Sequence, residues 1–199
     1  MEQTIAELIA QLGRSTHGDA FTRGLNPAQW AALRYFNRAN RFSRTVGAFA
    51  RYHATTQGTA SQTTRALVQK GYLRRCPVKT DRRSFQLELS AKAKKCLIHD
   101  PFADLVMAVS TLTVGQRIQI LSGLKTMLDA LYTEQDRALF GACYSCGYLR
   151  EGAVCSSATG YACALFGEPL TEEEITRICA NYQPSPGSKE PPSDKPRFL

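Results

Sequence analysis

Residues 56–89 decide the fold of this 199-residue chain, and they read TQGTASQTTRALVQKGYLRRCPVKTDRRSFQLEL. A threonine able to cap a helix precedes small and apolar residues at helical spacing, and Gly71 is typical of a helix end. The hydrophobic period then changes from that of a helix to that of a strand. Residues 72–75 and 85–89 predict two short strands, and residues 77–84 predict a charged turn between them.

The flanking sequence adds helices on both sides of this stretch. Asn26-Pro27 is a good start for a helix that runs to about Ala39, because Asn caps free N–H groups and Pro fits the first helical position. Thr45 is a cap for a short helix over 46–52, and a third helix over 56–70 follows. This order of helices before two strands and a charged hairpin is that of a winged helix-turn-helix, so we expect a mainly α fold with a small β-wing.

Positive charge is concentrated in residues 41–95. This segment has thirteen Lys and Arg residues against the two acids Asp81 and Glu88, so its net charge of +11 exceeds the +8 of the whole chain. Each cation near a phosphate releases condensed counterions, so a polyanion is the expected partner. A basic surface that is merely solvated has the same composition, and charge alone does not separate the two interpretations.

The helix over 56–70 has the composition of a DNA-reading helix. Ala60, Thr64 and Leu67 share one face and can pack on the preceding helix, which leaves small and amide side chains on the other face. Such side chains suit the major groove, where Gln can bond an adenine edge twice. The groove candidates are Gln57, Thr59, Ser61 and Gln62, and the phosphate candidates are Thr55, Thr56 and Arg65. An ordinary solvent-exposed helix face is the competing interpretation.

The charged hairpin carries Lys79, Arg82 and Arg83 around Asp81. A cationic loop of this length fits the narrow, electronegative minor groove. Asp81 can hold an arginine in position through a charge-assisted hydrogen bond. The alternative is a surface turn with a local ion pair of little energetic value.

Three stretches together, residues 25–33, 55–73 and 81–90, resemble the MarR (multiple antibiotic resistance regulator) family of winged-helix regulators. The last stretch, DRRSFQLELS, fits the family's wing pattern of Asp, any residue, Arg and a strand ending in Leu-Thr, with Ser90 here in place of Thr. The resemblance covers residues 1 to about 135. It implies a homodimer joined by the N-terminal and C-terminal helices, a wing motif of Asp81 and Arg83, and groove contacts from Thr55 to Arg65.

Five of the seven cysteines lie in the last third of the chain, beyond the point where ordinary members of that family end. Their spacing is Cys143-x2-Cys146-x16-Cys163-x15-Cys179, with Cys155 between the second and third. In a cytoplasmic protein such clustering indicates metal or redox chemistry rather than structural disulfides. A zinc ribbon pairs two Cys-x2-Cys knuckles, whereas this chain has one. An iron–sulfur cluster has a larger body that accepts scattered ligands.

The cysteine segment also resembles an extension found on a subset of MarR-like regulators. That resemblance implies Cys143, Cys146, Cys163 and Cys179 as ligands and leaves Cys155 as a spare or exchange ligand. We expect an iron–sulfur cluster as the cofactor, with zinc and a reversible thiol–disulfide switch as the alternatives.

The leading hypothesis is a homodimeric, sequence-specific regulator of transcription that binds a pseudo-palindromic, double-stranded DNA operator. The cysteine-bound centre would set DNA affinity by changing how the cysteine region packs on the long helices. In the main alternative, the protein is a repressor that has a structural zinc site and responds to a small-molecule effector near Trp30, Tyr35 and Phe36. An iron–sulfur or zinc enzyme, or an electron carrier, is less favoured because no general-base arrangement, phosphate loop or cofactor fingerprint is found, so we expect no enzyme.

The expected organisation of the chain has five parts. They are an N-terminal dimerisation helix in 1–24, the winged helix-turn-helix in 25–90, C-terminal dimerisation helices in 91–139, a cysteine-rich metal-binding region in 140–183 and a disordered tail in 184–199. The N-terminus lacks the basic start of a signal peptide, and no apolar run approaches the roughly 18–20 residues that span a bilayer. We therefore expect a cytoplasmic protein with no membrane partner.

Overall fold

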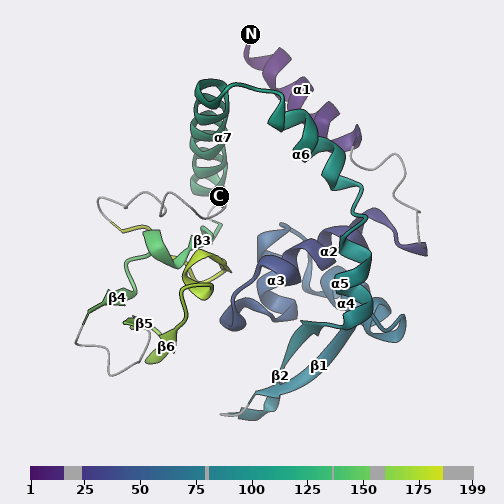
Figure 1. The fold of residues 1–199 in the computed structure, drawn as a ribbon, viewed down its shortest axis with the longest axis vertical. Helices are drawn as coiled ribbons and strands as arrows, with labels where there is room; N and C mark the ends of the chain where they lie inside the picture. Colours follow the sequence, from purple (N-terminus) through teal and green to yellow (C-terminus); the bar gives the residue numbers. More distant parts are fainter. Residues whose placement is uncertain (16–23, 79–80, 136, 153–159, 186–199) are drawn as a thin grey trace.

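The computed structural model describes residues 1–15, 24–78, 81–135, 137–152 and 160–185. Its central body, which we call the winged-helix unit, covers residues 24–97 (Figure 1). The unit consists of the helices α2 (Pro27–Arg38), α3 (Val46–Tyr52), α4 (Gln57–Gln69) and α5 (Ala91–Leu97), the 3-10 turn η2 (Arg41–Ser43), and the antiparallel strands β1 (Leu73–Val78) and β2 (Asp81–Leu89).

The helices of this unit begin where the capping residues predict. Asn26 accepts a hydrogen bond from the backbone N–H of Gln29 at 2.9 Å, and the Gln29 side chain accepts one from the N–H of Asn26, so the two form a capping box. Thr45, Thr56 and Ser90 cap the helices that follow them through their hydroxyl oxygens. The helix starts predicted at Asn26-Pro27, Thr45 and Thr56 are therefore confirmed.

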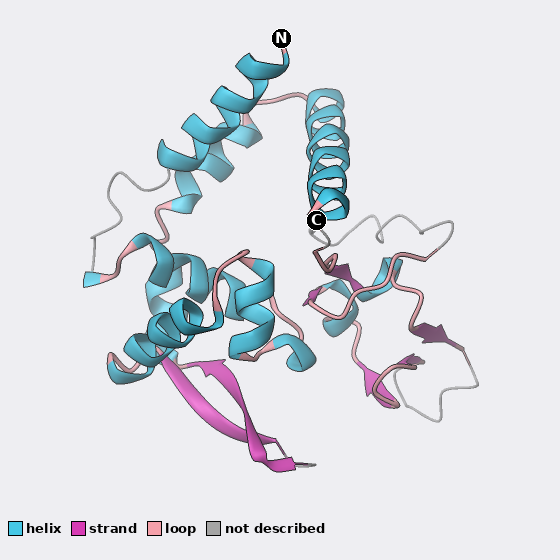
Figure 2. Ribbon diagram, turned by 180° about the vertical axis from the view of Figure 1, so that it is seen from behind, coloured by secondary structure: helices cyan, strands magenta, loops and turns pink. Residues whose placement is uncertain are grey.

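The β-hairpin is longer than the sequence predicts. β1 continues to Val78 and β2 already begins at Asp81, so most of the segment 77–84 that was expected to be a turn is strand. The pairing register shifts between Pro77 and Val78, where proline supplies no N–H to the ladder. Figure 2 shows the hairpin projecting from the helical body as a pair of magenta strands.

The core of the winged-helix unit is built on α2. Trp30, Tyr35 and Phe36 are at most 2% exposed and pack with buried residues of α3, α4 and β2. The Tyr35 ring lies edge-on to Phe36, with the ring centroids 5.2 Å apart. These three side chains, considered above as the lining of an effector pocket, are therefore packing residues of the core.

Three further helices extend away from the winged-helix unit: α1 (Glu2–Ser15), α6 (Phe102–Ser110) and α7 (Val114–Glu134). α6 follows Pro101, and α7 starts behind a capping box of Thr113 and Gln116. α1 lies beside α6 in both views (Figures 1 and 2). All residues of these three helices are described, and none of them is buried. No helix among the described residues has both the length and the apolar character to cross a membrane.

The cysteine-rich segment folds into a small unit of short strands, which we call the cysteine module (residues 140–152 and 160–185). Its strands β3 (Gly141–Ala142) and β7 (Ile178–Cys179) pair with each other, and β4 (Leu149–Glu151), β5 (Tyr161–Cys163) and β6 (Glu168–Leu170) form an antiparallel sheet. Two 3-10 turns, η3 (Cys143–Ser145) and η4 (Glu174–Thr176), connect them. Pro184 and Ser185, expected in a disordered tail, pair with Cys146 and Ser145, while residues 186–199 lie outside the described residues.

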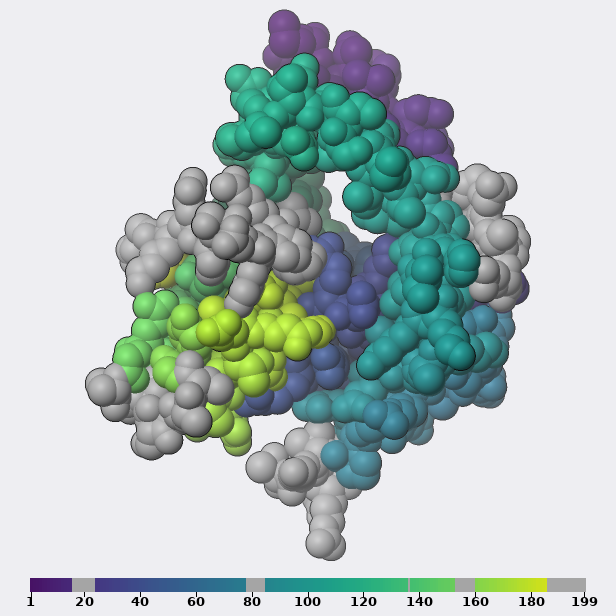
Figure 3. Space-filling view, viewed as in Figure 1, coloured from purple at the N-terminus to yellow at the C-terminus, as the bar shows by residue number. Residues whose placement is uncertain are grey.

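The cysteine module packs mainly on the winged-helix unit, not on the long helices as the sequence analysis expected. Ile178 and Ala180 are buried members of the same apolar cluster as α2 and α3. Figure 3 shows the yellow-green surface of the module lying directly against the blue surface of the winged-helix unit. A contact with α7 is made at Phe140, whose ring centroid lies 5.5 Å from that of Tyr132 and 4.5 Å from that of Tyr52 in α3.

His53, directly after α3, is enclosed by aromatic rings. The centroid of its ring lies 4.8 Å from that of Phe49 and 5.0 Å from that of Tyr52. Burial, assisted by the positive charge of Arg34, lowers the pKa of His53 from 6.5 to about 4. The folded protein therefore holds this histidine neutral at pH values at which the unfolded chain protonates it.

Stability should therefore fall as the pH decreases from about 6.5 to about 4, because in this window the unfolded state binds a proton that the folded state does not. We expect the free energy of unfolding to drop by about 2 kcal/mol between pH 7 and pH 5 through this group. Urea unfolding at a fixed protein concentration measures the effect. His53→Phe should flatten the pH dependence, whereas the same measurement on His99→Gln, which changes an exposed histidine, should match the wild type.

Candidate functional site

Helix α4 presents the face that the sequence analysis assigned to DNA. Ala60, Thr64 and Leu67 are at most 3% exposed and point into the core, as predicted. The Thr64 hydroxyl donates to the carbonyl oxygen of Ala60 at 2.9 Å, so its burial leaves no unpaired donor. The opposite face is exposed at Gln57, Gly58, Thr59, Gln62, Arg65 and Gln69, and Ser61 is half-buried.

The N-terminal turn of α4 is held in position by α3. Ala54, in the turn between the two helices, has a φ of 51°, and the N–H of Thr55 donates to the carbonyl oxygen of Ala50 at 3.0 Å. The hydroxyl of Thr56 accepts from the N–H of Thr59 at 3.1 Å and lies 2.9 Å from the Thr59 hydroxyl. These hydrogen bonds fix the backbone at the N-terminal end of α4, and with it the positions from which the exposed side chains project.

The wing carries the remaining DNA candidates. The backbone of Asp81, Arg82 and Arg83 opens strand β2, and the side chains of these three residues lie outside the described structure, as does the whole of Lys79. Nearer the body, the N–H of Leu87 donates to the carbonyl oxygen of Arg44 at 2.7 Å, which ties β2 to the start of α3. Strand β1 contacts α4 directly, so the hairpin lies next to that helix.

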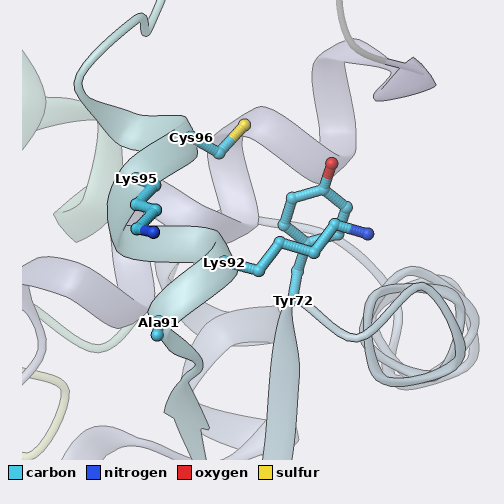
Figure 4. A pocket seen from close by; sticks show the side chains of 5 residues that line it. All are labelled: Tyr72, Ala91, Lys92, Lys95 and Cys96. Carbon is cyan, nitrogen blue, oxygen red and sulfur yellow. The ribbon is translucent and has the colours of Figure 1, made fainter.

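Exposed cations surround α4 and the hairpin. Arg74 pairs with Glu88 at 2.7 Å, and this hydrogen bond lowers the pKa of the Glu88 carboxyl. Lys92 extends over the ring of Tyr72, with its Nζ 4.3 Å from the ring centroid, and donates to the carbonyl oxygen of Lys70 at 2.8 Å. Figure 4 shows Lys92 and Lys95 bordering a hollow beside α5 together with Tyr72, Ala91 and Cys96. The positive charge predicted for residues 41–95 is therefore spread over the surface of α4, β1 and α5.

The four cysteines named as ligands converge in the cysteine module. Cys143, Cys146, Cys163 and Cys179 are free thiols, each 5–8% exposed, and all four line one cavity. Burial raises the pKa of Cys143 to about 12, and the neighbouring Cys179, Cys146 and Cys163 contribute to that rise. Residues separated by up to 36 positions in the sequence are thus gathered around one apolar space.

Local backbone geometry fixes each of these thiols. The N–H of Cys146 donates to the carbonyl oxygen of Cys143 at 2.9 Å, which closes the knuckle at η3. Cys163 ends β5, and the N–H of Gly167 closes the following turn onto its carbonyl oxygen at 2.8 Å, with a φ of +66° that favours glycine. Cys179 lies in β7, paired with Gly141 of β3.

Gly141 is closely covered by Tyr182. A Cβ atom at position 141 would lie 2.8 Å from the Tyr182 ring, well inside van der Waals contact. The Tyr182 hydroxyl in turn donates to the carbonyl oxygen of Ser145 at 3.0 Å, so the ring is held over the knuckle.

No three His, Cys, Asp or Glu side chains within the described residues form a set that could hold a single metal ion. Cys155, the spare candidate, lies outside the described residues. The four thiols share a cavity but are not arranged as a closed single-ion site. The ligand assignment therefore stays a prediction.

Asn40 is a residue that the sequence analysis missed. It is fully buried, and its side-chain amide lies 3.8 Å from the Cys143 sulfur, to which it donates. Its side-chain oxygen accepts from the N–H of Ser43 at 3.0 Å, and its own N–H donates to the carbonyl oxygen of Ile178 at 2.9 Å. The capping role of Asn40 before η2 is visible in sequence, whereas its contact with a cysteine 103 positions away is not.

The two isolated cysteines have no comparable surroundings. Cys96 is buried in the core of the winged-helix unit. Burial and a hydrogen bond with Glu88 raise the pKa of Cys76, so the neighbouring arginines do not activate its thiol. Cys96 is therefore a packing residue of the core, whereas Cys76 is a half-buried residue of strand β1.

Comparison with known proteins gives a family match for the winged-helix unit. Residues 23–84 match the model described as MarR family. No curated protein matches the chain.

Solved structures share the fold over a larger part of the chain. A MarR transcriptional regulator from Methanosarcina mazei Go1 is 24% identical with a TM-score of 0.53, and the match covers 66% of this chain and 98% of the other. BldR from Sulfolobus solfataricus is 20% identical with a TM-score of 0.53, covering 65% and 92%. The S. aureus MepR–DNA complex is 18% identical with a TM-score of 0.50, covering 65% and 96%.

These matches include nearly the whole of each regulator and leave about a third of this chain outside them. The matched residues 23–84 include α2, α3, α4, β1 and the beginning of β2. Residues 23–84 therefore match the MarR family model, and the chain shares its mainly helical winged-helix fold with the solved MarR regulators.

Proposed function

We propose that this protein is a homodimeric, sequence-specific DNA-binding regulator of transcription. The observation that carries the proposal is the exposed polar face of α4, rich in amide and hydroxyl side chains, next to a basic hairpin in a MarR-family domain. Side chains of this kind read base edges in the major groove, and the cations around them neutralise phosphates. The same fold is found in the S. aureus MepR–DNA complex, which supports the assignment.

In this proposal α4 enters the major groove by its N-terminal half. Gln57, Thr59, Ser61 and Gln62 face the bases, and Thr55, Thr56 and Arg65 contact phosphates. The wing follows the adjacent minor groove with Lys79, Asp81, Arg82 and Arg83. Exposure of the α4 residues supports the first part, and the position of the hairpin next to α4 supports the second.

The second copy of the chain covers the exposed helices. Ile5, Leu8 and Leu12 of α1 are 45–59% exposed, and Val114, Ile118 and Ile120 of α7 are 47–64% exposed. Apolar surface of this extent on helices without buried residues is unfavourable in water unless a partner covers it. A symmetric dimer through these helices would also place two copies of α4 for a two-fold operator.

The cysteine module holds the regulatory centre of this proposed protein. Four buried, free thiols that line one cavity form a donor set for soft metal centres. Four thiolates can complete a zinc site or hold an iron–sulfur cluster, and the presence of one Cys-x2-Cys knuckle where a zinc ribbon has two is the reason for preferring the cluster. Gain or loss of the centre changes DNA affinity.

The DNA-binding assignment predicts different effects for two substitutions. Gln62→Ala should relax the sequence preference, because a base contact is lost, while Gln69→Ala at the far end of the same exposed face should leave it unchanged. Arg83→Ala should weaken binding and reduce the salt slope by about 1, because a phosphate-region cation is removed. Operator titrations at several salt concentrations measure both. Arg14→Ala in α1, at the opposite end of the molecule from the wing, is the control, and an Arg83 variant with unchanged salt slope would refute the wing assignment.

The dimer assignment predicts that a charge on the exposed helices separates the copies. Leu8→Glu and Ile118→Glu should shift the protein to monomer in sedimentation velocity, because each places a carboxylate in a desolvated contact. Gln11→Glu adds the same charge at a position of α1 that is already polar and should leave the dimer intact. A wild-type protein that sediments as a monomer at micromolar concentration is the result that contradicts the dimer.

The metal assignment predicts a coloured protein. Anaerobic purification should give brown protein with broad absorption near 400 nm and with bound iron and sulfide, and Cys163→Ser should lose them while Cys76→Ser keeps them. Removing the centre should change operator affinity by about 5-fold to 150-fold, the usual range of coupling between two sites. Colourless protein with bound zinc identifies the alternative metal, and affinity that is unchanged by metal removal limits the centre to a structural role.

A further inference from the structure

We infer that the segment 39–45 couples the cysteine module to both DNA-contacting elements, α4 and the wing, so that a structural change in the module alters their positions. Asn40 is the positioning residue. This inference rests on the proposed function and names the route by which the centre would act. It replaces the route through the long helices that the sequence analysis expected. The segment consists of Ala39, Asn40, the turn η2, Arg44 and Thr45.

The backbone of this segment pairs with the cysteine module. Ala39 forms a parallel bridge with Ile178, and the N–H of Asn40 donates to the carbonyl oxygen of Ile178 at 2.9 Å. Two residues after Ile178, the N–H of Ala180 donates to the Ser43 hydroxyl at 2.9 Å, and both Ala180 and Ser43 are buried. The strand that carries Cys179 is therefore bonded to the segment on both sides of the cysteine.

Side chains of the same segment add contacts to the rest of the module. Arg41 donates to both carboxylate oxygens of Glu174 at 2.7 Å and also to the carbonyl oxygen of Pro169. The rings of Phe42 and Phe166 stack with centroids 4.1 Å apart and planes 7° apart. Phe166 belongs to the turn that follows Cys163, so this contact reaches a second cysteine.

Asn40 joins these contacts to the cavity itself. Among the described residues that line the cavity, Asn40 is the one that belongs to the winged-helix unit, and the others all belong to the cysteine module. The cavity volume is about 10 Å³, room for about one water molecule. An iron–sulfur cluster is much larger than this cavity, so a cluster held by Cys143, Cys146, Cys163 and Cys179 would have to displace these thiols and the Asn40 amide that contacts one of them. A displacement of Asn40 also changes its hydrogen bonds with Ser43 and Ile178.

The far end of the segment leads to both DNA-contacting elements. Thr45 caps α3, which packs against α4 in a core that includes the buried Ala48 and Ala60. The carbonyl oxygen of Arg44 accepts from the N–H of Leu87 in the wing at 2.7 Å. The Arg44 side chain donates to the carbonyl oxygen of Ala39 at 3.2 Å. A shift of this segment therefore changes the position of α4 through α3 and that of the wing through β2.

The test compares operator affinity with the centre present and removed. Protein reconstituted anaerobically with ferrous iron and sulfide is one form, chelator-stripped protein is the other, and the ratio of their dissociation constants measures the coupling. Asn40→Ser keeps a side-chain oxygen that can cap Ser43, because serine is a good N-cap, but it lacks the amide that reaches Cys143. Asn26→Ser, the same change at the cap of α2, is the matched control.

We expect Asn40→Ser to bring the ratio close to 1 while the stripped protein binds the operator as the wild type does and the reconstituted protein keeps its absorption spectrum. Asn26→Ser should keep the wild-type ratio. Phe166→Leu changes a residue of the cysteine module that is 41% exposed, and it should lower the ratio of dissociation constants part of the way toward 1. This variant replaces Asn40→Ser as the test if Asn40→Ser does not fold or does not bind the centre. The changes in ratio are read as fold-changes in dissociation constant.

An Asn40→Ser protein that loads its centre and keeps the wild-type ratio overturns the inference and leaves the proposed function standing. If Asn40→Ser does not load, a wild-type ratio in Phe166→Leu overturns it in the same way. A wild-type ratio of 1, or wild-type protein that takes up neither iron and sulfide nor Zn²⁺, overturns the proposed regulation and the inference with it. In these last cases DNA binding itself is judged separately, by the operator titrations.

Discussion

The buried pairing of the chain at Asn40 with Ile178 is the interaction on which the arrangement of this molecule depends. It joins two segments that are 138 positions apart, and each backbone hydrogen bond there is shielded from water. Because a buried N–H or carbonyl group without a partner is costly, the two segments favour being formed together. The cysteine module is thus part of the same core as α2 and α3, although it follows the long helix α7 in the sequence.

Local sequence signals predicted the winged-helix unit well because its helices start at recognisable caps. Asn26, Thr45 and Thr56 each accept the hydrogen bond that their sequence position indicates. The alternation of Phe85, Leu87 and Leu89 predicted β2, but its beginning at Asp81 was missed. Charged residues next to a proline are typical of turns, and pairing with β1 outweighed that local preference here.

Long-range contacts were the part that the sequence did not reveal. The spacing of the cysteines indicated which thiols to group, and all four line one cavity. Nothing in that spacing identified the surface on which the module would dock, because the contacts of Arg41, Phe42 and Ser43 with the module connect residues more than 100 positions apart. The roles of Asp81, Arg82, Arg83 and Cys155 are predictions from the sequence, because their side chains lie outside the described residues.

The Tyr182 ring that covers Gly141 restricts which sequences can form this module. Any side chain at that position would collide with the ring of Tyr182, which is itself bonded to the knuckle. Glycine at 141, the Cys-x2-Cys pair starting two residues later, and tyrosine three residues after the last cysteine therefore form one steric unit. A search of genomes for these spacings behind a winged-helix domain would recover relatives by a geometric requirement, even where overall sequence identity has been lost.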